Sequence, residues 1–179
     1  HYLPFFDLLM KINEKGFKVL TIDGRCGSGK STLGKLLSDV YQCPLIHMDD
    51  FYLPKELRTP ERYNEPGGNV HYERFEDEVY LNILKGVDFK YGVFSHEVMG
   101  VHHYQEVKAS ERYVIEGSYS FHPKLRKYSD FKVFLTQNKE SQKKRIIKRK
   151  WIYQTKDQMI WQELQHQNWL KSSLMNKLL

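Results

Sequence analysis

The chain has 179 residues, of which 40% are hydrophobic, a length that suits one domain with a sizeable core and is too short for two ordinary ones. Two cysteines are too few for a disulfide scaffold, and neither a membrane-spanning apolar run nor a signal peptide is present, so we expect a soluble, cytoplasmic protein. The net charge of +6 attracts anions, which excludes neither nucleotides nor nucleic acids as ligands.

Hydrophobic periodicity predicts that strands alternate with helices along most of the chain. In order, the expected elements are a helix from Phe5 to near Gly16 at the sheet edge, a strand at 18–23, a helix at 31–41, a strand at 45–48, a helix from Tyr72 to Gly86, a strand at 112–115, a short helix or turn at 122–128, a strand at 131–135, and helices at 140–151 and 157–179. This alternation implies a parallel sheet with right-handed crossovers. We therefore expect a single α/β domain over residues 1–179, with three layers and helices on both faces of the sheet.

One long segment interrupts this pattern at residues 51–70. It is rich in proline and glycine and has no clear periodicity. A loop of this length in a compact domain is usually either a substrate loop or disordered. We favour a substrate loop, because Tyr52, Arg58, Arg62 and Tyr63 are suited to holding a planar or anionic ligand.

A second interruption, at residues 89–108, mixes aromatic, β-branched and histidine residues around glycines and is typical of a hairpin. His96, His102 and His103 raise the alternative of a zinc site. Their spacing, without a nearby cysteine or paired acid, makes this a weak case. A hairpin that faces the substrate, or simple surface exposure, explains the histidines better.

Between the first expected strand and helix lies a glycine-rich stretch that fits the phosphate-binding pattern G-x-x-x-x-G-K-[ST]. Glycines allow a tight turn that points backbone N–H groups inward, and the helix that follows adds the positive end of its dipole. Lysine can reach the outer phosphates, and a hydroxyl can bind the Mg²⁺ that accompanies ATP or GTP. The candidate nucleotide-binding residues are Gly24, Gly27, Ser28, Gly29, Lys30, Ser31 and Thr32.

Two acids follow expected strands, at the end of the sheet where α/β proteins place their chemistry. Asp49 is a candidate to take a proton from an acceptor hydroxyl, directly or with the metal nearby. Glu116 is a candidate to hold a Mg²⁺-bound water. Taken alone, Asp49 would be better explained as the start of a turn or a helix cap, and Glu116 has the alternative of a capping carboxylate. The phosphate loop beside them favours the catalytic interpretation.

Arg145 and Arg149 lie four residues apart, on one face of a basic helix within an expected lid at 140–156. There they could neutralise charge on a transferred phosphoryl group. The alternatives are a solvated face or a nucleic-acid patch, which would make the protein a nucleotide-regulated binding module without turnover. A GTPase is a further alternative, since residues 138–141 (Asn-Lys-Glu-Ser) are similar to a guanine-reading motif; however, Ser141 lacks the carboxylate that would pair with guanine.

Five blocks of sequence occur together in one order between Lys18 and Arg149: residues 24–32, residues 48–54 (Met-Asp-Asp-Phe-Tyr-Leu-Pro), residues 65–69 (Glu-Pro-Gly-Gly-Asn), Tyr91 with Phe94 and His96, and residues 114–119 (Val-Ile-Glu-Gly-Ser-Tyr). Together they resemble uridine kinase-like P-loop kinases. This group also takes in nicotinamide riboside kinases and, more distantly, phosphoribulokinase and pantothenate kinase.

The resemblance implies ATP- and Mg²⁺-dependent phosphoryl transfer to a hydroxyl, commonly the 5′-hydroxyl of a nucleoside. It implies that Asp49 is the base, that Glu116 attends the metal and that Arg145 and Arg149 are lid arginines. The candidate acceptor-binding residues are Asp50, Tyr52, Arg62, His71, Tyr91 and His96, and the candidate metal-site residues are Ser31, Asp49 and Glu116. The expected partner is a small-molecule acceptor rather than a nucleic acid or a membrane. No oligomeric state is predicted.

The sequence departs from this family at three places. His71 stands where relatives that bind a ribose commonly carry an acid. The expected lid continues into a tail containing Gln and Trp. The sequence ends at Leu179, where relatives often add a strand and an adenine-side loop.

Overall fold

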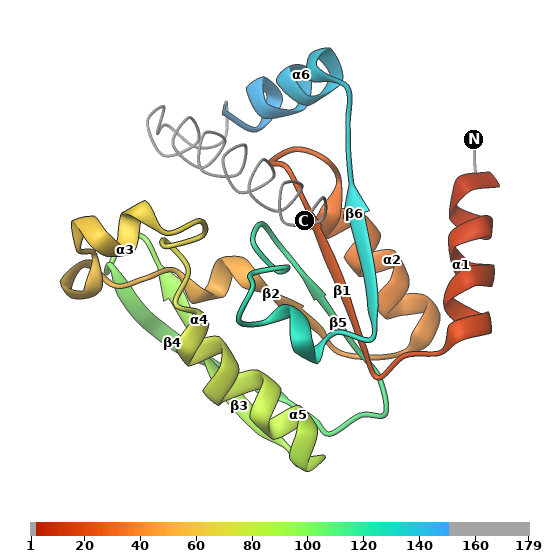
Figure 1. Ribbon diagram of the computed structural model, residues 1–179, viewed down its shortest axis with the longest axis horizontal. Coiled ribbons are helices and arrows are strands. Elements are labelled where there is room, and N and C mark those ends of the chain that lie inside the picture. The colour runs from red at the N-terminus through yellow and green to blue at the C-terminus, as the bar shows by residue number, and fades with distance from the viewer. Residues whose placement is uncertain (1–2, 151–179) are drawn as a thin grey trace, which may run out of the picture.

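The computed structural model describes residues 3–150, which form three layers around a parallel sheet (Figure 1). The sheet has the strand order β2-β5-β1-β6, with β1 at Val19–Gly24, β2 at Leu45–His47, β5 at Tyr113–Glu116 and β6 at Phe131–Leu135. A separate antiparallel hairpin pairs β3 (Phe89–Ser95) with β4 (Gly100–Val107). The predicted α/β fold class, the four strands and the hairpin are confirmed.

Helices connect these strands and cover the sheet. The α-helices are α1 (Leu3–Lys15), α2 (Lys30–Tyr41), α3 (Pro60–Asn64), α4 (Tyr72–Phe75), α5 (Leu81–Lys85) and α6 (Lys139–Lys150). Shorter turns are η1 (Met48–Phe51), η2 (Lys55–Leu57), η3 (Glu76–Tyr80) and η4 (Arg126–Tyr128). As expected, α1 lies at the sheet edge, where Lys15 Nζ is 5.7 Å from the centre of the Phe131 ring on β6. The helix predicted at 157–179 lies outside the described residues.

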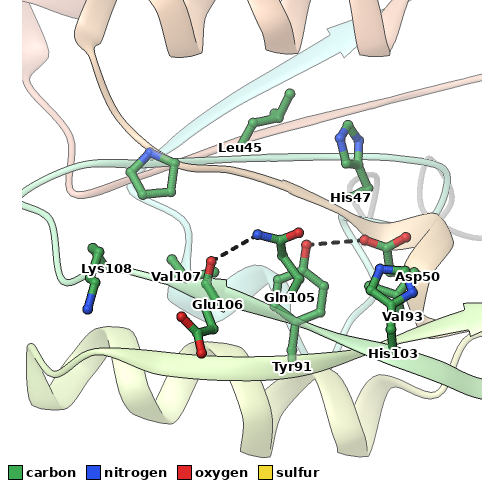
Figure 2. A pocket seen from close by; sticks show the side chains of 11 residues that line it. Leu45, His47, Asp50, Tyr91, Val93, His103, Gln105, Glu106, Val107 and Lys108 are labelled. Carbon is green, nitrogen blue, oxygen red and sulfur yellow. Dashed lines mark hydrogen bonds between the residues drawn. The ribbon is translucent and has the colours of Figure 1, made fainter.

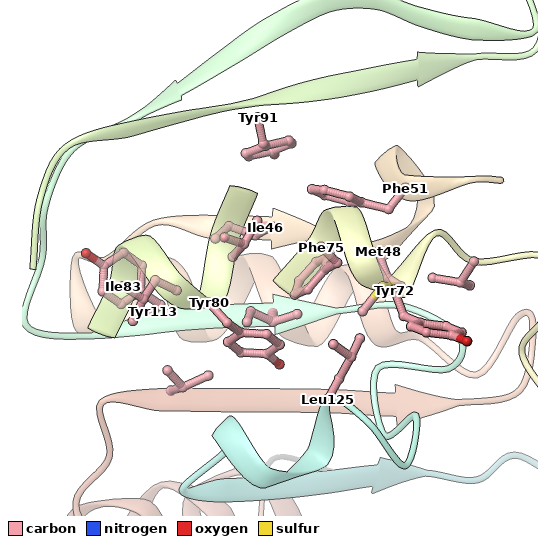
Figure 3. Packing of buried hydrophobic residues seen from close by; sticks show 14 of the residues in the cluster. Ile46, Met48, Phe51, Tyr72, Phe75, Tyr80, Ile83, Tyr91, Tyr113 and Leu125 are labelled. Carbon is pink, nitrogen blue, oxygen red and sulfur yellow. The ribbon is translucent and has the colours of Figure 1, made fainter. Parts of the chain in front are cut away.

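Alternating side chains divide the core between the two faces of the sheet. On one face, Val19 and Ile115 belong to a cluster that includes buried residues of the helical stretch from α4 to α5. Figure 3 shows three of these helical residues, Phe75, Tyr80 and Ile83. On the other face, Leu20 packs with Ile12 of α1 and Leu37 of α2, and all three are fully buried. Because the central strands are buried on both faces, they read in the sequence as continuous apolar runs. None of the described helices is long and apolar enough to cross a membrane.

The helix predicted to end at Gly86 is confirmed, and it contains a π-helical turn, η3, between α4 and α5. A π-turn inserts one extra residue into the helix. In this helix Val79 and Tyr80, which lie within η3, are both buried. Gly86 ends the helix with a φ of +69°.

The interpretation of residues 51–70 as a loop without periodic structure is wrong in part, because η2 and α3 lie within this segment. The Thr59 hydroxyl accepts a hydrogen bond from the Arg62 N–H (3.2 Å), and Pro60 occupies the first turn of α3. Thr followed by Pro is a recognised helix start. A short helix has too few residues to show periodicity, so the Thr-Pro pair was the only feature of the sequence that indicated α3.

A buried histidine secures this segment against the rest of the domain. The His122 ring stacks on Tyr72 with 4.3 Å between ring centres, and Gly67 of the 51–70 segment packs so closely that an added Cβ would lie 3.1 Å from His122. Burial and the nearby charge of Arg62 lower the pKa of His122 to about 4. The ring is therefore neutral in the folded protein at neutral pH.

We predict that His122 makes the protein sensitive to mild acid. In the unfolded chain a histidine takes up a proton near pH 6.5, so between this pH and about 4 the unfolded state binds more protons and the free energy of unfolding falls as the pH falls. The full effect is on the order of 3 kcal/mol. Urea unfolding of the wild type and of His122→Phe, which keeps the stacking, should show a smaller loss between pH 7 and pH 4.5 in the variant. Equal losses would contradict the prediction.

Candidate active site

The carboxyl ends of the parallel strands meet at one edge of the sheet, and the phosphate loop follows β1 there. Gly24 and Gly29 have φ values of +151° and +102°, a region that favours glycine. A Cβ at Gly24 would lie 2.4 Å from the carbonyl oxygen of Leu135 on β6. The loop thus turns tightly at the N-terminus of α2, an arrangement suited to binding phosphate.

A buried carboxylate fixes the start of this loop. Asp23 is fully buried and accepts backbone N–H bonds from Gly24 (2.6 Å), Tyr119 (3.3 Å) and Phe121 (2.9 Å). Such bonds offset the desolvation of a buried negative charge. They also tie the phosphate loop to the segment that follows β5. Asp23 was not among the predicted site residues. The only indication of its role in the sequence is that it is an acid within a strand expected to be buried.

Lys30 lies inside the loop and is buried. Its ammonium donates hydrogen bonds to the carbonyl oxygens of Gly24 (2.8 Å) and Arg25 (3.1 Å). These bonds use two of its three N–H donors, so the third is available to a ligand. Ser31 and Thr32 follow in the first turn of α2 and are exposed. First-turn N–H groups have no acceptor within their own helix. A polyphosphate fits this set of donors.

Asp49 lies in η1, directly after β2, and its side chain is open to solvent. The surrounding protein desolvates this carboxyl and raises its pKa; the negative charge of Glu116 acts in the same direction, whereas Lys30 opposes both. These mutual effects place Asp49, Glu116 and Lys30 in one site. A raised pKa with an open side chain suits a group that accepts a proton.

Glu116 ends β5 and is buried, and its Oε1 lies 2.7 Å from Nδ1 of His47 at the end of β2. This hydrogen bond is the main reason that the pKa of His47 is raised. The sequence analysis assigned His47 no role, although strand pairing places the two residues side by side.

The candidate metal residues offer a sparse set of oxygen donors. Among residues 3–150, no three His, Cys, Asp or Glu side chains form a group that would hold a metal by themselves, and this includes the hairpin histidines. Ser31, Asp49 and Glu116 supply one hydroxyl and two carboxylates. This set fits Mg²⁺, which keeps several waters and is usually bound by few protein groups together with substrate phosphates.

Aromatic rings from the hairpin and the 51–70 segment lie together near Asp49. Tyr52 is 4.8 Å from His96 and 5.8 Å from Phe94, measured between ring centres. Desolvation and the charge of Arg58 lower the pKa of His96, while the charge of Asp49 acts in the opposite direction. The predicted acceptor residues Tyr52 and His96 are therefore neighbours of the candidate base.

A cavity of about 510 Å³ lies between the β2 edge of the sheet and the hairpin (Figure 2). His47 and Asp50 line one side, and Tyr91 and His103 line the other. The Tyr91 hydroxyl donates to Asp50 Oδ2 (3.1 Å), so these two predicted acceptor residues contact each other. Burial raises the pKa of Asp50.

Arg74 joins the hairpin to η1. Its guanidinium donates to the Gly92 carbonyl oxygen of β3 (2.7 Å), to the Asp50 carbonyl oxygen of η1 (2.7 Å) and to Glu78 Oε2 (3.0 Å). The sequence analysis did not identify Arg74, because its partners are distant in the chain.

Two other predicted acceptor residues make different contacts. Arg62 donates two bonds to the Glu73 carboxylate (2.7 and 2.8 Å) and further bonds to backbone carbonyls, and it stacks over Tyr72. These bonds hold the 51–70 segment in place. His71 is partly buried before α4, where burial and Arg74 lower its pKa. A substrate role for either residue stays a prediction.

The expected lid begins as α6, which contacts the phosphate loop. Gln142 Nε2 donates to the Cys26 carbonyl oxygen (2.9 Å), and Arg145 Nη1 lies 3.4 Å from the Gly27 carbonyl oxygen and 3.5 Å from that of Ser28. Arg145 therefore lies beside the phosphate loop, and its role as a lid arginine stays a prediction. The Arg149 side chain and lid residues 151–156 lie outside the described part of the chain.

The stretch that is similar to a guanine-reading motif begins α6. Asn138 Oδ1 accepts the Ser141 N–H (2.8 Å), and the Asn138 carbonyl oxygen accepts the Gln142 N–H (3.0 Å). This is the geometry of a helix N-cap. A capping role accounts for Asn138 without guanine, which weakens the GTPase hypothesis.

No protein-family model matches the sequence, and no curated protein matches it significantly. Solved structures, however, share its fold. A Bacillus stearothermophilus protein described as a possible uridine kinase has a TM-score of 0.60 at 23% identity, covering 83% of this chain and 86% of its own. A Silicibacter sp. TM1040 protein, provisionally named a fructose transport system kinase, has a TM-score of 0.64 at 18% identity, covering 90% of this chain and 87% of its own.

The chain shares the three-layer α/β fold of these two proteins. The similarity that the sequence blocks indicate is thus confirmed for the fold. Within this fold, the structure brings Lys30, Asp49 and Glu116 into one site, with Arg145 beside the phosphate loop. Their catalytic roles stay predictions.

We predict that the phosphate loop of this fold requires glycine at position 24. In Gly24→Ala the new methyl would meet the Leu135 carbonyl oxygen and add backbone strain, so we expect a loss of about 3 kcal/mol in the free energy of unfolding. Gly86→Ala is the control: it has a positive φ but nothing within 4 Å of the added Cβ, and should lose about 1 kcal/mol. Urea unfolding measures both values. Equal losses would contradict the prediction.

Proposed function

We propose that the protein transfers the terminal phosphoryl group of ATP to a hydroxyl of a small molecule, most plausibly the 5′-hydroxyl of a nucleoside. The observation that carries this proposal is the position of Asp49: it is open to solvent, and the charges of both Lys30 and Glu116 act on it. A phosphate cradle beside an accessible carboxylate is the minimum arrangement for phosphoryl transfer to an alcohol.

Each group in the site has a role in this reaction. Mg²⁺, when bound with ATP, would neutralise phosphate charge, with Ser31 and the carboxylates as its protein neighbours. Lys30 and the first-turn amides of α2 hold the outer phosphates and stabilise negative charge as it moves. Asp49 orients the acceptor hydroxyl and takes its proton. Arg145 lies beside the phosphate loop and is available to add positive charge.

Two observations favour a nucleoside as the acceptor. The cluster of Tyr52, Phe94 and His96 offers aromatic faces near the candidate base, and such faces suit a planar ring. One solved structure with this fold is described as a possible uridine kinase. The second candidate acceptor is a sugar. Another solved structure with this fold is provisionally named a fructose transport system kinase, and in this chain His71 replaces the acid expected for ribose binding.

The test is an assay with ATP, Mg²⁺ and a panel of acceptors that contains pyrimidine and purine nucleosides, nicotinamide riboside, free ribose and fructose. We expect phosphorylated product that depends on the acceptor, with nucleosides preferred over free sugars. Product from the sugars alone would move the acceptor class to sugars. Salt-sensitive RNA or DNA binding without turnover would support the binding-module alternative, and acceptor-independent GTP hydrolysis would support a GTPase.

We predict that Asp49→Asn lowers acceptor-dependent turnover by about 10² to 10⁴-fold, because the amide cannot take the proton. ATP binding, followed by isothermal titration calorimetry, should be retained. Asp39→Asn is the matched control, since Asp39 is an exposed acid on α2 paired with Lys35, and it should leave turnover unchanged. Full turnover in Asp49→Asn would reject the assigned base.

A further inference from the structure

Glu116 is an acid that the fold buries at the edge of the phosphate site. It is 5% exposed, and its Oε1 lies 2.7 Å from His47 Nδ1. A buried carboxylate needs hydrogen-bond donors to offset its desolvation, and a donor also determines where the oxygens point. The orientation of Glu116 therefore depends on the few groups that touch it.

Two neighbours restrict Glu116. His47 on β2 pairs with Glu116 on β5, so the register of the sheet determines the position of the imidazole. On the α2 side, a Cβ at Gly34 would lie 3.1 Å from Glu116 Cγ and 3.3 Å from its Cβ. The stem of Glu116 is thus packed against the backbone of α2, and its carboxylate is bonded to His47.

The orientation of Glu116 matters to the candidate site. Its negative charge acts on Asp49, and α2 carries Lys30 and Ser31 at its N-terminus. His47 also lines the cavity opposite the hairpin, as Figure 2 shows, so its ring lies between that cavity and Glu116.

We infer that His47 is a positioning residue: its Nδ1–H donates to Glu116 and holds the carboxylate in the orientation that supports Mg²⁺ bound with a nucleotide. This inference rests on the proposed function, and it concerns residues of this chain rather than an observed metal. Groups that orient the neighbours of a metal commonly change metal affinity by about 10 to 100-fold when they are removed.

The variants separate a bond from mere packing. In His47→Asn the amide nitrogen takes a position close to that of Nδ1, so the bond to Glu116 is kept. In His47→Gln the side chain is one carbon longer and its amide nitrogen is nearer the Nε2 position, so the bond is lost while a polar side chain of similar bulk remains. His47→Ala removes both. His103→Ala is the control, since His103 lines the same cavity, whereas the histidine bonded to Glu116 is His47.

The experiment measures ATP affinity by isothermal titration calorimetry, with and without Mg²⁺. We expect the gain in affinity that Mg²⁺ provides to fall by about tenfold in His47→Ala and His47→Gln, and to be close to wild type in His47→Asn and His103→Ala. ATP affinity without Mg²⁺ should stay unchanged in all variants. Three results would overturn the inference. The increase in ATP affinity that Mg²⁺ provides could be as large in His47→Gln as in the wild type, it could be no larger in His47→Asn than in His47→Gln, or it could be absent from the wild type. If His47→Ala does not fold, the Asn and Gln variants decide.

These outcomes are distinct from those of the acceptor assay. A protein that binds ATP with Mg²⁺ but phosphorylates no acceptor would reject the proposed function, and the binding curves would still decide the role of His47. Conversely, acceptor-dependent product together with an unchanged Mg²⁺ gain in His47→Gln would reject only the positioning role.

Discussion

The carboxylate of Asp23 is the constraint on which the arrangement of the site depends. It accepts N–H bonds from the phosphate loop and from the segment after β5, so the two segments cannot separate without leaving a buried charge unsatisfied. Glu116 lies at the start of that second segment. The position of the phosphate loop relative to Glu116 is thereby set by the bonds of Asp23 to the backbone rather than by contacts between the candidate site's side chains.

The site combines a positive half and a negative half. Lys30 and Arg145 lie at the phosphate loop, whereas Asp49, Asp50 and Glu116 follow the neighbouring strands. Parallel strands make this separation possible, because all their carboxyl ends lie at one edge of the sheet and the segments that follow them meet there. The hairpin then places aromatic rings beside the acidic half.

Much of the fold and of the candidate site could be predicted from local sequence patterns, because the phosphate loop and the buried strands each depend on residues close together in the chain. Asp49 and Glu116 could be placed at one edge because each directly follows a predicted strand of a parallel sheet. The bonds of His47, Gln142 and Arg74 could not be predicted, because they depend on register and packing between distant segments. The π-turn could not be predicted either, because the apolar residues Tyr72, Phe75, Val79 and Ile83 keep the spacing of a regular helix. The short helix α3 did have a signal, its Thr-Pro start, although periodicity did not reveal it.

Arg74 has a mechanical consequence. One planar guanidinium is bonded at once to the hairpin, to the backbone of η1 and to its own helix, and it also lies over the Phe51 ring. The hairpin and the turn that carries Asp49 are therefore joined through one side chain. A shift of the hairpin that kept these bonds would move the backbone beside Asp49 with it.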